Sequence, residues 1–214
     1  MKDRGAWLAL LALVIIVVVL VFAGHAGSPA SAPDHRSTSD AANGTSALRL
    51  YAQALGHRID TMEAAFAIPQ DAGLVFVFRP SARPFTGDDA NVLLRWVEAG
   101  GILVYASEEA DVSLEGAFNL ARQRAPAPAE ADAAAPVFAG VRHLSGGVLA
   151  FPFTLHPQQV AVLRNGGHAA VGLLATVGQG RIVALADPIP LCNGYLERAD
   201  NGRFAADLLA LSTG

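Results

Sequence analysis

Residues 187–201, DPIPLCNGYLERADN, hold the side chains of this chain that come closest to a chemical site. Carboxylates placed close together can bind a cation or a hydroxyl group, and a thiol beside a base can act as a nucleophile. This stretch contains three carboxylates, two carboxamides and the only cysteine of the chain: Asp187, Glu197, Asp200, Asn193, Asn201 and Cys192. The sequence must then show whether these groups form a ligand site or only a turn and a helix start.

Cys192 has two interpretations. A nucleophilic cysteine needs a base and a strained strand-to-helix turn built from small residues. The surrounding sequence, P-L-C-N-G, follows a strand but places Pro190 and Leu191 before the thiol. We therefore expect Cys192 to be a small, part-buried apolar residue. A thiol nucleophile is the alternative.

The polar residues divide into two groups. Asp187 ends the apolar run 181–187, and ligands of open α/β sheets bind at the carboxyl ends of strands. Asp187, Asn193 and Glu197 are therefore candidates for a ligand or partner surface. Asp200 and Asn201 directly precede the last helical pattern, where a short polar side chain caps free backbone N–H groups, so we predict a structural role for them. We assign no catalytic residue.

A β-α-β unit is predicted over residues 73–107. GLVFVF (73–78) is an apolar run of strand length, Thr86 and Asp89 form a capping box at a helix start, and ILVYAS (102–107) is the next strand. The runs 168–178 and 181–187 predict a hairpin. We expect an α/β fold, a three-layer sandwich whose sheet is mostly parallel with an antiparallel hairpin at its edge.

The flanking segments predict a membrane tether. Residues 6–23 carry no charge and reach roughly 27 Å as a helix, which is enough to cross a bilayer. Lys2 and Arg4 precede this run, so the N-terminal residues 1–5 are expected in the cytoplasm and the domain outside the membrane. A cleaved signal peptide is the alternative. Residues 24–44 read as a flexible linker, residues 45–212 as the domain, and residues 125–136 as a low-complexity inserted loop.

Composition excludes several functions. The net charge is −4, which disfavours nucleic acid, and a single cysteine cannot form an internal disulfide. No phosphate-binding loop, dinucleotide fingerprint or H-E-x-x-H motif occurs, and the six histidines are scattered. We predict no cofactor and no metal.

Three stretches carry a resemblance to a known family. SALRLYAQALGH, LLRWVEAGGILVYAS and GQGRIVALADPIPLCNGYLERADNGRFAADLLA resemble the DUF4350 family of membrane-anchored bacterial and archaeal proteins. The resemblance implies a flavodoxin-like fold related to class I glutamine amidotransferases. It also implies a genomic association with a MoxR-type AAA ATPase and a DUF58 protein, and no established activity. The residues that match the family pattern in the polar segment are Asp187, Pro188, Asn193, Asp200 and Asn201.

The resemblance also bears on catalysis. An amidotransferase of this class needs a cysteine on an elbow, and no cysteine follows the strand 102–107. The first hypothesis is therefore a membrane-tethered, non-catalytic binding or assembly module with a protein partner. The alternative is a divergent amidotransferase-like or hydrolase enzyme that uses Asp187 or Cys192.

Overall fold

The computed structural model describes residues 35–62, 66–79 and 85–213. The predicted membrane span 6–23 and the first part of the predicted linker lie outside these residues. Within the part of the chain that is described, no helix has both the length and the apolar character needed to cross a bilayer.

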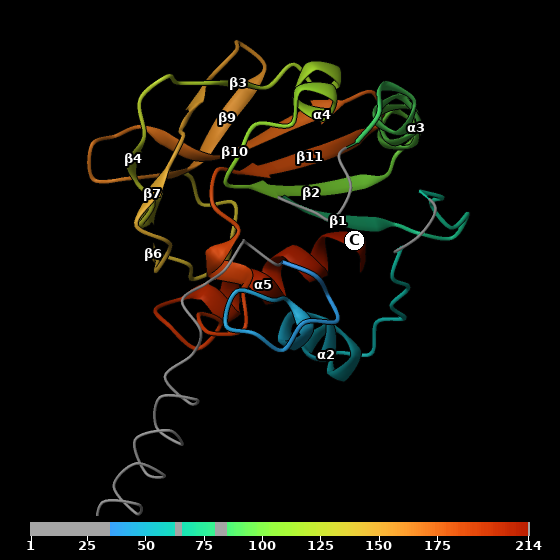
Figure 1. Cartoon of the computed structure of the whole chain (residues 1–214), viewed down its shortest axis with the longest axis horizontal. Coiled ribbons are helices and arrows are strands. Elements are labelled where there is room, and N and C mark those ends of the chain that lie inside the picture. Colours follow the sequence, from blue (N-terminus) through green and yellow to red (C-terminus); the bar gives the residue numbers. More distant parts are fainter. Residues whose placement is uncertain (1–34, 63–65, 80–84, 214) are drawn as a thin grey trace, which may run out of the picture. The chain divides into compact units, whose positions relative to one another are not determined.

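The predicted β-α-β unit is present and forms one side of the main sheet (Figure 1). Strand β1 (Leu74–Arg79) pairs in parallel with β2 (Ile102–Ser107), and β2 pairs in parallel with β11 (Gly180–Leu185). Helix α3 (Gly87–Glu98) crosses between β1 and β2. Its N-terminus has the expected capping box, in which Thr86 Oγ1 accepts from the Asp89 N–H.

The other side of the sheet is antiparallel. Strand β10 (Ala170–Val177) forms the predicted hairpin with β11. It continues through β9 (Gln159–Arg164), β5 (Ala131–Ala133) and β6 (His143–Leu144), all paired antiparallel. The sheet order is β1-β2-β11-β10-β9-β5-β6. The sheet is therefore mixed, and its antiparallel part is larger than the edge hairpin expected from the sequence.

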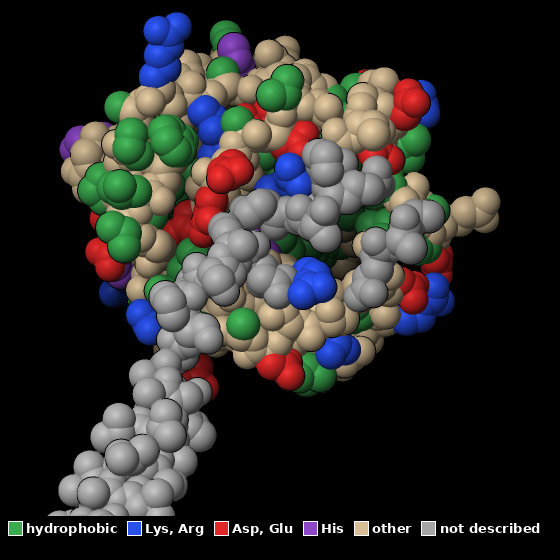
Figure 2. Space-filling view, viewed as in Figure 1, with side chains coloured by type: hydrophobic (Ala, Val, Ile, Leu, Met, Phe, Trp, Pro, Cys, Tyr) green, Lys and Arg blue, Asp and Glu red, His purple; other side chains and the backbone are tan. Residues whose placement is uncertain are grey.

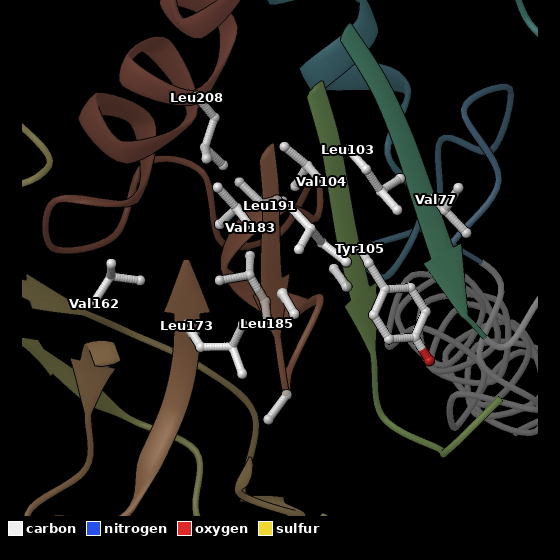
Figure 3. Packing of buried hydrophobic residues seen from close by; sticks show 14 of the residues in the cluster. Val77, Leu103, Val104, Tyr105, Val162, Leu173, Val183, Leu185, Leu191 and Leu208 are labelled. Atoms are coloured by element: carbon white, nitrogen blue, oxygen red, sulfur yellow. The ribbon is translucent and has the colours of Figure 1, made fainter. Parts of the chain in front are cut away.

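Helices lie on both sides of the sheet in Figure 1, with α3 and α4 (Val112–Ala117) on one side. On the other side lie α2 (Ser46–Ala54) and α5 (Asn201–Ala210), followed by the single turn η2 (Leu211–Thr213). Figure 3 shows apolar side chains of the central strands and of α5 packed together, including Val104, Leu173, Val183 and Leu208. Burial of each such side chain contributes about 1.5–3 kcal/mol, so this cluster anchors both helical layers to the sheet.

One segment expected to be an irregular loop belongs to the ordered domain. Residues 125–136 contain β4 (Ala127–Pro128) and β5, and Ala129 and Ala131 are buried. The short strand β4 pairs with β7 (Leu149–Ala150), and β3 (Ala121–Arg122) pairs with β8 (Phe153–Thr154). The small alanine side chains that make this stretch look like low-complexity loop allow it to pack closely.

Candidate functional site

Two neighbouring parallel strands bring acidic side chains to one edge of the sheet. Glu108 directly follows β2, and Asp187 lies two residues after the end of β11. His35 and Cys192 reach the same edge from the segment before α2 and from the turn η1 (Ile189–Leu191). We call His35, Glu108, Asp187 and Cys192 the strand-edge cluster.

Asp187 is held by the backbone rather than turned to solvent. Its side chain is buried, with the whole residue 6% exposed. Oδ1 accepts a hydrogen bond from the Ile189 N–H at 2.9 Å, and Oδ2 accepts one from the Gly147 N–H. Burial raises the pKa of Asp187 to about 6, although the two N–H donors favour the ionised form and oppose this shift. Asp187 therefore joins the loop before β7 to the turn after β11.

Cys192 is 0% exposed. Its Sγ lies 3.4 Å from His35 Nδ1 and 3.4 Å from the Pro188 carbonyl oxygen, which can accept the S–H. Burial, followed by the negative charges of Asp187 and Glu108, raises the pKa of the Cys192 thiol far above its usual range. A thiol in this setting stays protonated and is a poor nucleophile.

His35 links the cluster to the segment before α2. Its Nδ1 lies 2.8 Å from the Asn43 carbonyl oxygen, and its Nε2 lies 3.7 Å from Glu108 Oε1. Burial lowers the pKa of His35, but its interaction with Glu108 and its hydrogen bond to the Asn43 carbonyl raise it more, so the net shift is upward. The negative charge of Glu108 favours the protonated ring, although the buried Nε2 forms no hydrogen bond at this distance.

The order Cys192, His35, Glu108 resembles a nucleophile, a base and an orienting carboxylate. However, a ring nitrogen that donates to the Asn43 carbonyl cannot accept the thiol proton at the same time. The cavity beside Asp187 has a volume of only about 10 Å³ and a mostly apolar lining, which leaves no room for a substrate at that carboxylate. Asp187 and Cys192 are thus closed in this structure, and His35 is the member of the cluster that also lines a larger cavity.

Asn193 is fully used in holding the N-terminal segment of the domain. Its Nδ2 donates to the Ser39 and Ala41 carbonyl oxygens at 2.8 and 2.7 Å, and its Oδ1 accepts from the Ala47 N–H at 2.8 Å. The Asn193 and Gly194 N–H groups also donate to carbonyl oxygens of this segment. Residues 35–44, expected as the end of a flexible linker, are therefore fastened to the domain.

Asp200 and Asn201 have structural contacts that differ from the predicted helix cap. Asp200 occupies the N-cap position of α5 but forms no side-chain cap bond. Its Oδ2 instead accepts from the Arg142 and His143 N–H groups at 2.9 and 3.1 Å. Asn201 is fully buried and binds both the N–H and the carbonyl of Ser145, and also the Tyr195 carbonyl. Asp200 therefore fixes the start of β6, and Asn201 the residue that follows β6, against the start of α5.

The structure separates the three predicted surface residues. Asp187 and Asn193 lie inside hydrogen-bond networks, whereas Glu197 is exposed. No sequence pattern pointed to His35 or Glu108, because His35 lies in an apparent linker and Glu108 in a loop after a strand. Among the residues that the structure describes, no group of three histidine, cysteine or acidic side chains could hold a metal ion.

A second region of the molecule is open. A cavity of about 920 Å³ lies between α2, the segment after it and β1. Figure 2 shows a hollow with apolar side chains at its floor on the face where α2 and β1 appear in Figure 1. We call this cavity the β1 groove. Its apolar lining comes mainly from β1 and from Met62, Phe66 and Phe85.

Solved structures with a similar fold belong to proteins of different kinds. The mmIFT52 N-terminal domain superposes with a TM-score of 0.63 at 14% identity, covering 80% of this chain and 91% of that domain. A cytoplasmic protein from Salmonella typhimurium gives a TM-score of 0.53 at 13% identity, with 78% and 83% covered. The exo-beta-1,4-mannosidase Op5Man5 from Opitutaceae bacterium strain TAV5 gives 0.50 at 13% identity, with 87% of this chain and 34% of the enzyme covered. At these identities the likeness shows the fold alone.

Sequence comparison gives the family. No curated protein matches the chain. The family model described as Domain of unknown function (DUF4350) matches residues 37–209, a stretch that includes β1, most of the β1 groove and most of the strand-edge cluster. The chain therefore belongs to the DUF4350 family.

Proposed function

We propose that this protein is a membrane-tethered, non-catalytic α/β module that binds or assembles with a protein partner. The observation that carries the proposal is the closed carboxyl edge of the sheet. Ligands of open α/β sheets bind at this edge, but here it holds the chain's own His35 and a Cys192 that is 0% exposed. A domain that closes this edge with its own residues has no place there for a substrate.

We also propose how this fold is related to a class of enzymes. Parallel strands β1, β2 and β11 with helices on both sides fit a flavodoxin-like, three-layer sandwich related to class I glutamine amidotransferases. In an amidotransferase of this class, the elbow with the nucleophile lies close to the end of the corresponding strand. Here β2 ends at Ser107, and no cysteine lies directly after it. We infer a scaffold that has lost the catalytic triad of that class.

The tether is proposed from the sequence. The uncharged run 6–23 after Lys2 and Arg4 favours a single span with the domain on the outer side. The family resemblance adds a MoxR-type ATPase and a DUF58 protein as candidate components of the same system. Protease treatment of spheroplasts tests the orientation: cleavage within residues 45–212 is expected, and complete protection of the domain would contradict it.

An enzyme remains the second candidate, because Cys192, His35 and Glu108 lie in the order of a thiol-dependent site. Such an enzyme would need the segment 35–45 to move away so that the thiol could meet a substrate. Asn193 holds this segment through hydrogen bonds to the Ser39 and Ala41 carbonyl oxygens, and these bonds oppose that movement.

The two candidates are separated by variants of the strand-edge cluster in the full chain in its membrane. Cys192→Ser and Asp187→Asn should complement a deletion strain as the wild type does, and photo-crosslinking should capture the same protein partner in all three. Circular dichroism of each variant controls for folding. Failure of a folded Cys192→Ser or Asp187→Asn chain to complement would support the enzyme and contradict the binding module.

A further inference from the structure

The β1 groove runs along the free edge of the sheet. Its lining includes five successive residues of β1, from Leu74 to Phe78. Successive side chains of a strand point to opposite faces, so a cavity that touches all five must pass around the edge of the strand. Strand β1 is the first strand in the sheet order and pairs only with β2 among the described residues.

The register shows which backbone groups face the groove. The Gly73 carbonyl accepts from the Ile102 N–H at 3.1 Å, and the Arg79 carbonyl accepts from the Glu108 N–H. In a parallel pair, alternate residues direct both of their backbone groups to the partner strand. Gly73, Val75, Val77 and Arg79 therefore face β2, and the N–H and C=O groups of Leu74, Phe76 and Phe78 point outward.

These outward groups have no backbone partner in the part of the chain that the structure describes. Edge strands are commonly protected by a lysine, a proline or a bulge. The strand carries a single charged residue, Arg79 at its end; residues 74–78 contain no charged residue and no proline, and their pairing with β2 runs without a register shift. The edge is therefore a template for one more strand.

The walls of the groove suit apolar side chains. The rings of Phe76 and Phe78 lie 6.0 Å apart and stacked, and Phe66 meets Phe85 edge to face at 5.1 Å. All four rings are partly buried and line the groove. An added strand would place every second side chain against this aromatic surface.

The charge of the groove differs in sign from that of the whole chain. The lining carries three arginines and two aspartates, whereas the whole chain has a net charge of −4. Arg58 lies 2.9 Å from Asp71 and 3.4 Å from Asp60, so this one arginine is paired with both aspartates of the lining. Arg49 of α2 donates to the neutral Ser37 carbonyl and keeps its positive charge at the α2 end of the groove. This end favours an acidic residue on the occupant.

We propose that β1 binds an extended segment of a partner protein by strand addition, with apolar residues at alternate positions and an acidic residue near Arg49. The proposal rests on the binding function and names the class of partner. A second copy of this chain fits less well, because pairing two β1 edges would leave the groove beside them unfilled. Strand addition by a separate segment satisfies the open backbone groups and fills the groove together.

The probe is a short blocked peptide in which valine and threonine alternate after an N-terminal glutamate, added to the full chain in nanodiscs. Residue-resolved hydrogen exchange should show the Phe76 and Phe78 amides slowed by about tenfold or more at about 1 mM peptide, the range of weak specific binding. The Val75 and Val77 amides should not change, because they already face β2. Absence of protection at Phe76 and Phe78 overturns the proposal.

Two controls test the mode of binding. The same peptide with N-methyl groups on alternate residues should lose binding, since it cannot pair with the strand; equal binding would overturn strand addition. Arg49→Glu should weaken binding several-fold, whereas Val148→Lys, which replaces a side chain 88% exposed and outside the groove, should not. Protection of Phe76 that appears without peptide and grows with protein concentration would assign the edge to self-association instead.

The peptide experiment and complementation by the cluster variants test different claims. If strand addition fails while Cys192→Ser and Asp187→Asn still complement, the binding module stands and only this surface is wrong. If the cluster variants fail to complement, the binding module is wrong whatever the peptide does.

Discussion

The strand-edge cluster and the β1 edge belong to one sheet and differ in how their polar groups are satisfied. At the cluster, Asp187, His35 Nδ1 and Cys192 each have partners within the domain. At β1, the outward backbone groups of Phe76 and Phe78 have no partner among the described residues. Buried polar groups are normally paired, so a rich set of polar residues can be entirely structural. Unpaired hydrogen-bonding groups are therefore found on the backbone of the apolar strand β1 and not in the polar segment 187–201.

The largest expected effect comes from breaking the closed region at Asn201. Asn201→Ala removes three hydrogen bonds from a fully buried site and leaves the Ser145 and Tyr195 backbone groups without that partner. We expect the free energy of unfolding to fall by roughly 3 kcal/mol. Urea denaturation measures it, with Glu197→Ala as the exposed control within about 0.5 kcal/mol. A loss below about 1 kcal/mol for Asn201→Ala would mean that this network is not a major contributor to stability.

A smaller and more local effect is expected at Asn193. Asn193→Ala removes the bonds to Ser39, Ala41 and Ala47 that fasten the segment 35–45. We expect a loss of about 2 kcal/mol, because these groups are partly accessible to water. Hydrogen exchange at the Ala47 amide, which donates to Asn193, should rise, while exchange in the centre of β11 should follow only global unfolding. An unchanged Ala47 amide would show that the segment is held by other contacts.

The third effect is a pH dependence of the free energy of unfolding that arises from Asp187. Its pKa is raised from 3.8 to about 6, so between these values the folded protein binds the proton more tightly than the unfolded chain. This group therefore removes stability as the pH rises from about 4 to 6, by at most about 3 kcal/mol. The raised pKa of His35 acts in the same direction at higher pH, since its contribution is present below 6.5 and lost as the pH rises through the folded value.

Comparison with Asp187→Asn isolates this contribution. The stability difference between wild type and variant should shift toward the variant as the pH rises from 4 to 7, measured by urea denaturation. Other acidic groups cancel in the difference, because both proteins share them. A difference that is constant over this range would contradict a buried, protonatable Asp187.

The sequence predicted those elements whose signals are local. The capping box of Thr86 and Asp89 and the tight turn at Gly178 lie within a few residues of the structure they specify, and both are present. The hydrogen bonds of Asn193 to Ala47, and the contact of Cys192 with His35, join residues 146 and 157 positions apart. Contacts between residues so far apart cannot be predicted from local sequence patterns. For this reason the packed segment 35–44 was predicted as a linker. Strand β5 was not predicted for a related reason: its alanine-rich sequence shows no regular alternation of apolar and polar residues that would indicate a strand.

The open edge could be read only in part. The run 73–78 predicts a strand covered on both faces, but only Val75 and Val77, which share one face, are buried, whereas Leu74, Phe76 and Phe78 on the other face are half-buried. Its place at the end of the sheet depends on the strand order, which one sequence does not reveal. The same limit explains why the polar segment 187–201 was the first candidate for a site.

The central claim is that the strand-edge cluster is closed and its thiol inert. The most direct test is the rate at which iodoacetamide alkylates Cys192, the only cysteine, in the native chain at pH 7 to 8. We expect a rate at least about a hundredfold below that of the urea-unfolded chain, because the reaction must wait for opening of the segment 35–45, and Asn193→Ala should speed it. A native rate equal to or above that of the unfolded chain would reveal an accessible, activated thiol and contradict the account.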